Sequence, residues 1–196
     1  MKREGRTAAV LHRASLCLAL AGFAATQGVA GKAVRDRPDP GAGAAEQVAF
    51  ALADAENARA NRETRRLAKA LKRLEALGAR PLDESAPAQA WQPATGKAAP
   101  MRGRPLGPGY RSGSLAPGAS AHIEQVFLSG ERASIALSAL SESGLKLEVH
   151  DRRAAQVCGR AGTPSQCRWV PTFTERYRIK VENPGRRPAR YFLVIE

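Results

Sequence analysis

The segment WVPTFTERYRIKVENPG, residues 169–185, carries the clearest strand pattern of this chain. Its apolar side chains Tyr177, Ile179 and Val181 alternate with charged ones, so an extended strand here has one apolar face and one charged face. The Asn-Pro-Gly tripeptide at 183–185 follows, and these residue types are typical of turns. The segment therefore predicts a half-buried strand whose chain turns toward the last apolar residues.

The same alternation recurs along the chain from residue 110 onward. It predicts six to eight short strands, separated by turn residues and including the stretches 121–128, 134–138, 145–150, 176–182 and 191–195. Short strands at this spacing are typical of antiparallel sandwiches. We therefore predict a mainly β fold: a small antiparallel, jelly-roll-like β-sandwich over residues 110–196, preceded by one long α-helix and a Pro-rich linker.

Residues 44–78 predict the long helix. They contain no proline, are rich in Ala, Leu, Arg, Lys and Glu, and end at Gly78. One helix of this length extends about 50 Å, whereas the sandwich is only about 30 Å across. The helix must therefore protrude, bend back or find a partner.

A linker is predicted over residues 79–109, because this stretch holds six prolines and many alanines and glycines. Proline makes such a segment semi-extended, so we expect it to hold the helix and the sandwich apart. Trp91 is its one large apolar residue, which either docks on a neighbour or marks a binding spot.

Residues 1–30 have the pattern of a secretory signal peptide. A basic start precedes an apolar run over residues 14–25, and small residues precede Gly31. A spanning helix needs about 20 apolar residues, and this run is shorter. We expect cleavage near Gly31, a flexible N-terminus over 31–43, no transmembrane segment in the mature chain, and a periplasmic or extracellular location.

The mature chain keeps two cysteines, Cys158 and Cys167. In an exported protein this pair favours a disulfide that closes a short loop. A zinc site is the competing interpretation, but the sequence has no CxxC motif, and His122 and His150 are the only mature histidines. We predict a disulfide, no metal and no cofactor.

A basic series lies within the predicted helix. The chain has 31 Lys and Arg against 18 Asp and Glu, for a net charge of +13. Two interpretations stay open: a solvated helix face, or a contact for an anionic surface such as lipid headgroups, acidic polysaccharide or nucleic acid. Export argues against nucleic acid. The series, at spacings of three and four, consists of Arg59, Arg62, Arg66, Lys69 and Arg73.

The strand-forming region also resembles a known family. The stretches that carry the resemblance are, in order, GSLAPGASAHIEQVFL, ASIALSAL, SGLKLEVHD, CRWVPTFTERYRIKVENPG and ARYFLVIE. Over residues 112–196 they resemble the bacterial pre-peptidase C-terminal domain, a small β-sandwich of exported proteins. The resemblance implies a non-catalytic module for secretion, localisation or substrate attachment. Some relatives bind polymers or calcium. This chain lacks the acidic residues that the family often has before the predicted strand 145–150, and it has Glu175 where the family commonly has glycine.

Motifs for catalysis are absent from the sequence, which has no GxSxG, no HExxH and no glycine-rich phosphate loop. We therefore expect that the protein is not an enzyme. We expect a non-catalytic exported binding or targeting module that contacts an anionic envelope or extracellular component. The alternative is a structural or assembly protein that self-associates through the 44–78 helix. A hydrolase accessory role ranks third.

Overall fold

The computed structural model describes residues 41–82, 107–140 and 143–196. These residues belong to one of two compact units of the chain, Arg35–Glu196. The predictions on the signal peptide, on residues 31–40 and on Trp91 lie outside the described residues. The described part has two helices and nine strands, so the predicted mainly β sandwich is confirmed.

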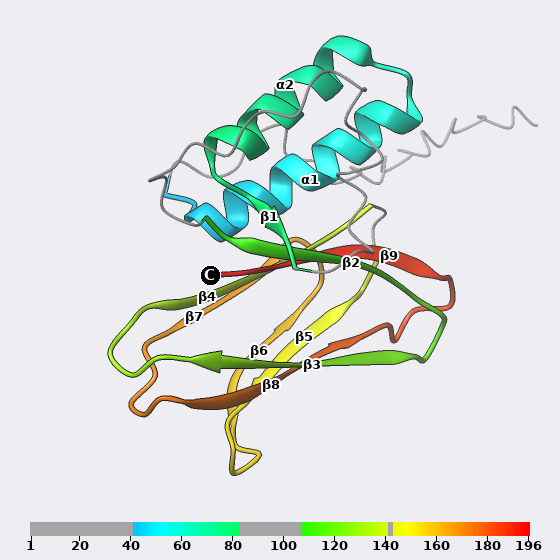
Figure 1. The fold of residues 1–196 in the computed structure, drawn as a ribbon. Coiled ribbons are helices and arrows are strands. Elements are labelled where there is room, and N and C mark those ends of the chain that lie inside the picture. Colours follow the sequence, from blue (N-terminus) through cyan, green and yellow to red (C-terminus); the bar gives the residue numbers. More distant parts are fainter. Residues whose placement is uncertain (1–40, 83–106, 141–142) are drawn as a thin grey trace, which may run out of the picture. The chain divides into compact units, whose positions relative to one another are not determined.

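The strands form two facing sheets (Figure 1). In the five-stranded sheet, called the central sheet, the order is β1 (Arg80–Pro81), β2 (Gly109–Leu115), β9 (Ala189–Ile195), β4 (Ala133–Ala139), β7 (Ser165–Trp169). In the four-stranded sheet, called the outer sheet, it is β3 (Ser120–Phe127), β8 (Glu175–Glu182), β5 (Lys146–His150), β6 (Gln156–Ala161). All the pairings except the short β1–β2 contact are antiparallel.

The main core lies between the two sheets. As the alternation predicts, β8 directs Tyr177, Ile179 and Val181 inward, and all three are buried. Opposite them the central sheet contributes the alternate side chains of β4 and β9. Residues 176–182 therefore supply part of the inner face of the outer sheet.

Asn183 organises the turn that follows β8. Its side chain is buried, and its Nδ2 donates hydrogen bonds to the carbonyl oxygens of Leu115, Ala116 and Arg187 at 3.0, 3.2 and 2.8 Å. Its Oδ1 accepts a hydrogen bond from the Gly185 N–H at 3.0 Å. The amide thus satisfies four backbone groups and ties the turn to the end of β2.

The predicted disulfide between Cys158 and Cys167 is confirmed. Cys158 lies in β6 of the outer sheet and Cys167 in β7 of the central sheet, so the bond joins the two sheets at one edge. Closing this short loop lowers the entropy of the unfolded chain, and the bond thereby contributes about 2.5 kcal/mol to the free energy of unfolding.

The predicted single helix over 44–78 is wrong, because the chain forms two helices, α1 (Ala44–Ala60) and α2 (Thr64–Ala76). Arg62 adopts a left-handed φ of 59° and ends α1. The Glu63 N–H bonds to the Ala58 carbonyl and the Arg62 N–H to the Arg59 carbonyl, which is the Schellman arrangement. Of the three alternatives left open for the helix, it bends back: α2 packs against α1, and Ala70 and Leu74 are buried in the apolar cluster that the two helices share.

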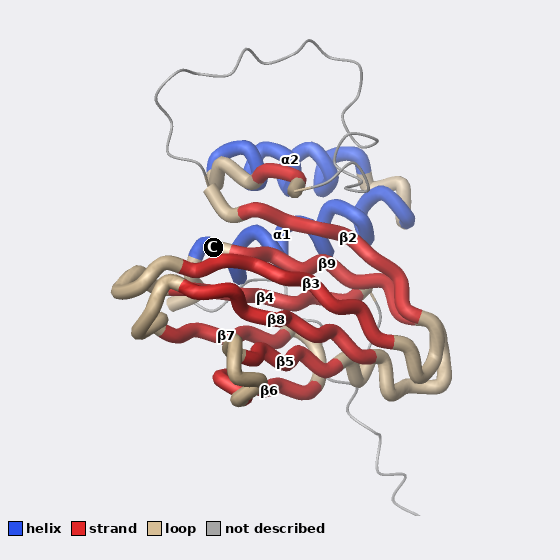
Figure 2. Tube along the Cα trace, turned by 60° about the horizontal axis from the view of Figure 1, so that its bottom comes forward, coloured by secondary structure: helices blue, strands red, loops and turns tan. Residues whose placement is uncertain are grey.

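The helical hairpin lies on the central sheet, on the face away from the outer sheet (Figures 1 and 2). Val48 and Leu52 of α1 pack with Tyr110 and Phe192 in a second apolar cluster. Burial raises the pKa of Tyr110 to about 12. The expected separation of helix and sandwich is therefore wrong, since the central sheet has an apolar face that α1 covers.

Small residues bring α1 close to the sheet. Ala136 of β4 faces the hairpin, and the Ser138 hydroxyl donates a buried hydrogen bond of 3.0 Å to the carbonyl oxygen of Ala49. Both ends of the predicted linker also join the sheet, since the Arg80 N–H bonds to the Pro108 carbonyl at 3.1 Å. Residues 83–106 of that linker lie outside the described residues.

Candidate polyanion-binding face of the hairpin

Helix α2 has opposite apolar and basic sides. Ala70 and Leu74 are buried against α1, with Leu67 and Leu71 partly buried beside them. On the other side lie three exposed bases at positions i, i+4 and i+7. These bases are Arg65, Lys69 and Lys72.

The five basic residues predicted to form one surface do not share a face. Arg59 ends α1, Arg62 lies in the turn, and Arg66, Lys69 and Arg73 belong to α2. The predicted spacing assumed an unbroken helix, and the reversal at residues 61–63 changes which bases lie side by side.

Three of these five residues contact neighbouring side chains. The Arg66 guanidinium lies 2.6 Å from Asp54 Oδ1 and 3.3 Å from Glu63 Oε2. Arg73 lies over the Phe50 ring, 5.9 Å from its centroid, and Arg59 pairs with an acid of α1. The contacts that Arg66 makes with Asp54 and Arg73 with Phe50 join α2 to α1, whereas the Arg59 pair lies within α1. All three bases are therefore engaged within the hairpin.

Glu56 is the acid that pairs with Arg59. Its side chain is only 4% exposed, and its Oε1 lies 2.8 Å from Arg59 Nη2 and 2.9 Å from Arg190 Nη1. The hydrogen bond from Arg59, together with the charges of both arginines, holds the pKa of Glu56 below its usual value. Because Arg190 belongs to β9, this carboxylate attaches α1 to the central sheet.

Four bases remain, which we call the basic stripe: Arg62, Arg65, Lys69 and Lys72. All four are exposed, and none forms an ion pair with another described residue. Arg65 and Lys72 fall outside the five residues predicted from the sequence. Counting the helical period from Thr64, where α2 begins, would have included both.

The outer sheet carries a second basic group that is neutralised locally. Arg176 Nη1 lies 3.0 Å from Glu124 Oε2. Lys180 Nζ lies 2.6 Å from Glu182 Oε2 and 3.7 Å from Glu148 Oε2. Acids and bases alternate across these neighbouring strands, so this face has mixed charge.

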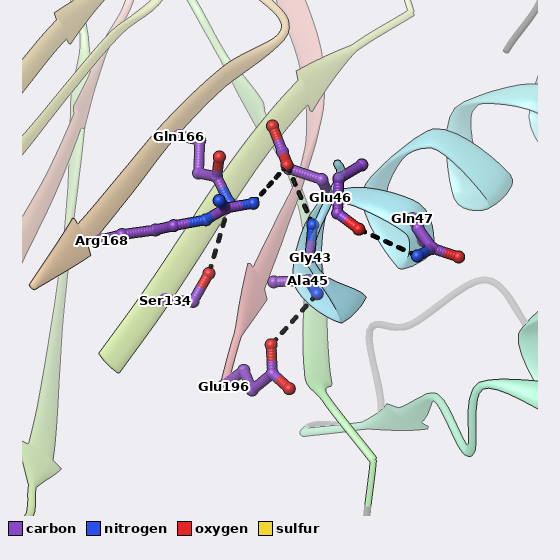
Figure 3. Close-up of polar contacts among 9 residues, drawn as sticks. Gly43, Ala45, Glu46, Gln47, Ser134, Gln166, Arg168 and Glu196 are labelled. Atoms are coloured by element: carbon purple, nitrogen blue, oxygen red, sulfur yellow. Dashed lines mark hydrogen bonds and ion pairs between the residues drawn. The ribbon is translucent and has the colours of Figure 1, made fainter. Parts of the chain in front are cut away.

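The positive end of α1 is already occupied by carboxylates of the protein (Figure 3). Glu46 Oε2 accepts hydrogen bonds from the Gly43 N–H at 3.2 Å and from Arg168 Nη2 at 2.6 Å. Glu196 Oε2 accepts one from the Ala45 N–H at 3.2 Å. These contacts tie α1 to β7 and to the residue that follows β9, and they place two carboxylates of the protein at the end of the helix where an external anion would bind.

Groups for catalysis or metal binding are sparse in the described part of the chain. Ser120 Oγ and His122 Nε2 lie 3.4 Å apart on the exposed face of β3, and no described carboxylate hydrogen-bonds that imidazole. His150 lies on the same sheet, in β5. Within the described ranges, no three His, Cys, Asp or Glu side chains come together as metal ligands.

Among residues 41–82, 107–140 and 143–196, no helix combines the length and the apolar character needed to span a lipid bilayer.

Comparisons with known proteins leave the family open. No protein-family model and no curated protein matches the chain. Solved structures with similarity include the periplasmic inhibitor of g-type lysozyme PliG from Aeromonas hydrophila, at 14% identity and TM-score 0.37, covering 45% of this chain and 84% of that one. The Yersinia pseudotuberculosis-derived mitogen has 10% identity and TM-score 0.40, covering 45% and 83%.

The pre-peptidase C-terminal domain of a Bacillus anthracis collagenase is similar at the same level. It has 14% identity and TM-score 0.38, covering 44% of this chain and 87% of that one. Similarities this distant assign neither a family nor a function, so the family named from the sequence stays a resemblance.

Proposed function

We propose that the protein is a non-catalytic exported binding module whose basic stripe contacts an anionic component of the cell envelope or the extracellular surroundings. The observation that carries this proposal is the set of four exposed bases without ion pairs in the described structure, Arg62, Arg65, Lys69 and Lys72. Other bases of the hairpin are held by Asp54, Glu56 and Glu63. The stripe therefore keeps its charge for an external partner.

The stripe lies on a well-anchored support. α1 is attached to the central sheet by the Ser138–Ala49 hydrogen bond and the Glu56–Arg190 ion pair, and α2 is joined to α1 by the Arg66–Asp54 pair. Little conformational entropy is lost when such charges meet a partner. At 1.5 Å per residue the bases of α2 span about 10 Å, which suits neighbouring anionic groups on one surface.

The expected strength favours a partner with repeated charges. A basic side chain near an anionic membrane surface contributes about 1 kcal/mol, so four contribute about 4 kcal/mol. That corresponds to a dissociation constant near 1 mM. A lipid surface or an acidic polysaccharide presents many such charges together, whereas a single small anion does not.

Export is supported by the disulfide, because such bonds persist in oxidising compartments. N-terminal sequencing of the protein from its own cell tests it. We expect the first residue near Gly31, and a start at Met1 would contradict export with cleavage.

The binding test is co-sedimentation with anionic vesicles and, separately, with acidic cell-wall polysaccharide, at low and high salt. We expect binding that weakens with salt and that is lost when all four stripe residues are replaced by Gln. A control with the same net charge replaces Arg152, Arg153, Arg160 and Arg178, which lie away from the hairpin, by Gln. Equal loss in the two variants, or binding that ignores salt, would contradict a role for the stripe.

The alternative, assembly through the helix, needs a free apolar side on residues 44–78. In the hairpin α1 directs its apolar side chains to the central sheet and α2 directs its own to α1. Sedimentation velocity of the protein alone tests this alternative, for which a stable dimer is the expected result.

A further inference from the structure

Two neighbouring loops at one end of the sandwich carry exposed apolar side chains. Residues 128–132 follow β3 and residues 170–174 follow β7. Phe173 is 70% exposed, Val170 59% and Leu128 50%, values unusual for such large apolar groups on adjoining loops.

Hydrogen bonds hold the two loops together. The Ser129 N–H donates to Thr174 Oγ1 at 3.0 Å, and the Ser129 hydroxyl donates to the Thr172 carbonyl at 2.7 Å. The Gly130 N–H donates to the Pro171 carbonyl at 2.9 Å. Because these polar groups satisfy one another, moving the loops out of water costs less than it would for an unpaired backbone.

An aromatic cluster supports the base of the loops. Phe127, Trp169 and Tyr177 form edge and tilted contacts, with ring centroids 4.9 to 5.7 Å apart. Phe127 directly precedes one loop and Trp169 directly precedes the other. The loops that carry the exposed side chains therefore begin at tightly packed aromatic residues.

A hollow of about 310 Å³ lies beside Leu128. Its charged lining has both signs, with Arg80 and Arg132 on one hand and Glu131 and Glu196 on the other. A lining of balanced charge complements a group that itself carries both charges. A zwitterionic phospholipid headgroup, with its phosphate and its amine, has that chemistry.

We propose that these two loops bind the surface of a phospholipid membrane, with Leu128, Val170 and Phe173 entering the apolar boundary and the headgroup lying over the adjacent hollow. A second copy of this chain fits less well, because three half-exposed side chains offer a patch of roughly a few hundred Å², whereas a stable dimer buries about 800 Å² on each partner. Shallow insertion needs only a few apolar side chains.

This surface is separate from the basic stripe, and so is its test. Binding through apolar side chains to uncharged membranes persists at high salt, whereas binding through the stripe does not. Failure of either proposal leaves the other standing.

The first experiment is co-sedimentation of the protein with phosphatidylcholine vesicles at high salt. We expect binding that falls at least tenfold when Leu128, Val170 and Phe173 are all replaced by Ser. The control Val157→Ser removes an apolar side chain that is 39% exposed on β6, and it should bind like the parent. Unchanged binding by the triple variant overturns the proposal.

A second experiment locates the contact. In the mature chain, whose two cysteines form the disulfide, Phe173→Cys and, separately, Val157→Cys are labelled with a polarity-sensitive dye. Vesicles should shift the emission of the label at residue 173 to the blue and leave that at residue 157 unchanged. An equal response of the two labels overturns the proposal. Self-association of the protein without vesicles also overturns it if the triple Ser variant abolishes that association, because the loops would then bind a second copy of the chain.

Discussion

The two helices of the hairpin differ in how much of their surface the fold covers. α1 lies between the central sheet and α2, and eight of its 17 residues are buried, five of them alanines with Val48, Leu52 and Glu56. α2 is the outer helix, and only Ala70 and Leu74 of its 13 residues are buried. Small side chains thus allow one helix to occupy a middle layer, while the outer helix keeps a whole side for charge.

The largest expected effect comes from placing a charge within α1. Leu52→Asp buries an unpaired carboxylate between helix and sheet, so we expect a loss of at least about 4 kcal/mol in the free energy of unfolding. Denaturant titration measures it. The matched change Lys69→Asp on α2 should cost less than about 0.5 kcal/mol. Similar losses at both positions would mean that the two helices are equally exposed.

The attachment of α1 through Glu56 is the next contact to break. Replacing both Arg59 and Arg190 by Ala leaves a buried carboxylate without its partners. We expect a loss of about 2 kcal/mol, less than for fully buried pairs because both arginines are half exposed. Adding Glu56→Gln to the double variant should recover part of this loss. No recovery would show that the arginines act by packing alone.

Acid should loosen the same attachment. Because the pKa of Glu56 lies below its usual value in the folded chain, its ion pairs contribute stability above about pH 4.5, and this contribution is lost as the pH falls through the folded-state pKa. Thermal melts between pH 7 and pH 3 should show a shallower decline for Glu56→Gln than for the parent. Parallel curves would contradict the assigned protonation.

The smallest effect on stability is expected at the basic stripe. Replacing Arg65, Lys69 and Lys72 by Gln removes charges that make no ion pair with a described residue, so we expect less than about 0.5 kcal/mol per site in thermal melts. Helical content by circular dichroism should stay unchanged. A cooperative loss of helix would show that these bases support α2 instead of serving an external partner.

Several features of the sandwich follow from neighbouring residues alone. The alternation in residues 176–182 predicts which side of β8 is buried, because successive side chains of a strand point to opposite faces. The disulfide follows from two cysteines and the expectation of export. Asn183, followed by Pro184 and Gly185, predicts the turn. The carbonyl groups of Leu115 and Ala116 that its amide binds belong to a distant segment, which only folding brings near.

The last strand shows a signal that the alternation rule alone misses. That rule assigns Tyr191, Leu193 and Ile195 of β9 to the core, and they are buried there. Phe192 and Val194 are buried as well, beneath α1. An uninterrupted apolar run is typical of a strand covered on both faces, so residues 191–195 already indicate a third layer.

The two helices are terminated for different reasons, one local to the sequence and one that depends on tertiary contacts. α2 is terminated by Gly78, two residues beyond its last residue, which the sequence predicts because glycine takes a left-handed φ, here 66°, at little cost. α1 is terminated by Arg62, two residues beyond its last residue, which takes a left-handed φ without that advantage. Only the folded chain compensates this cost, by burying Leu74 against α1 and by pairing Arg66 with Asp54, contacts between residues that no local pattern brings together.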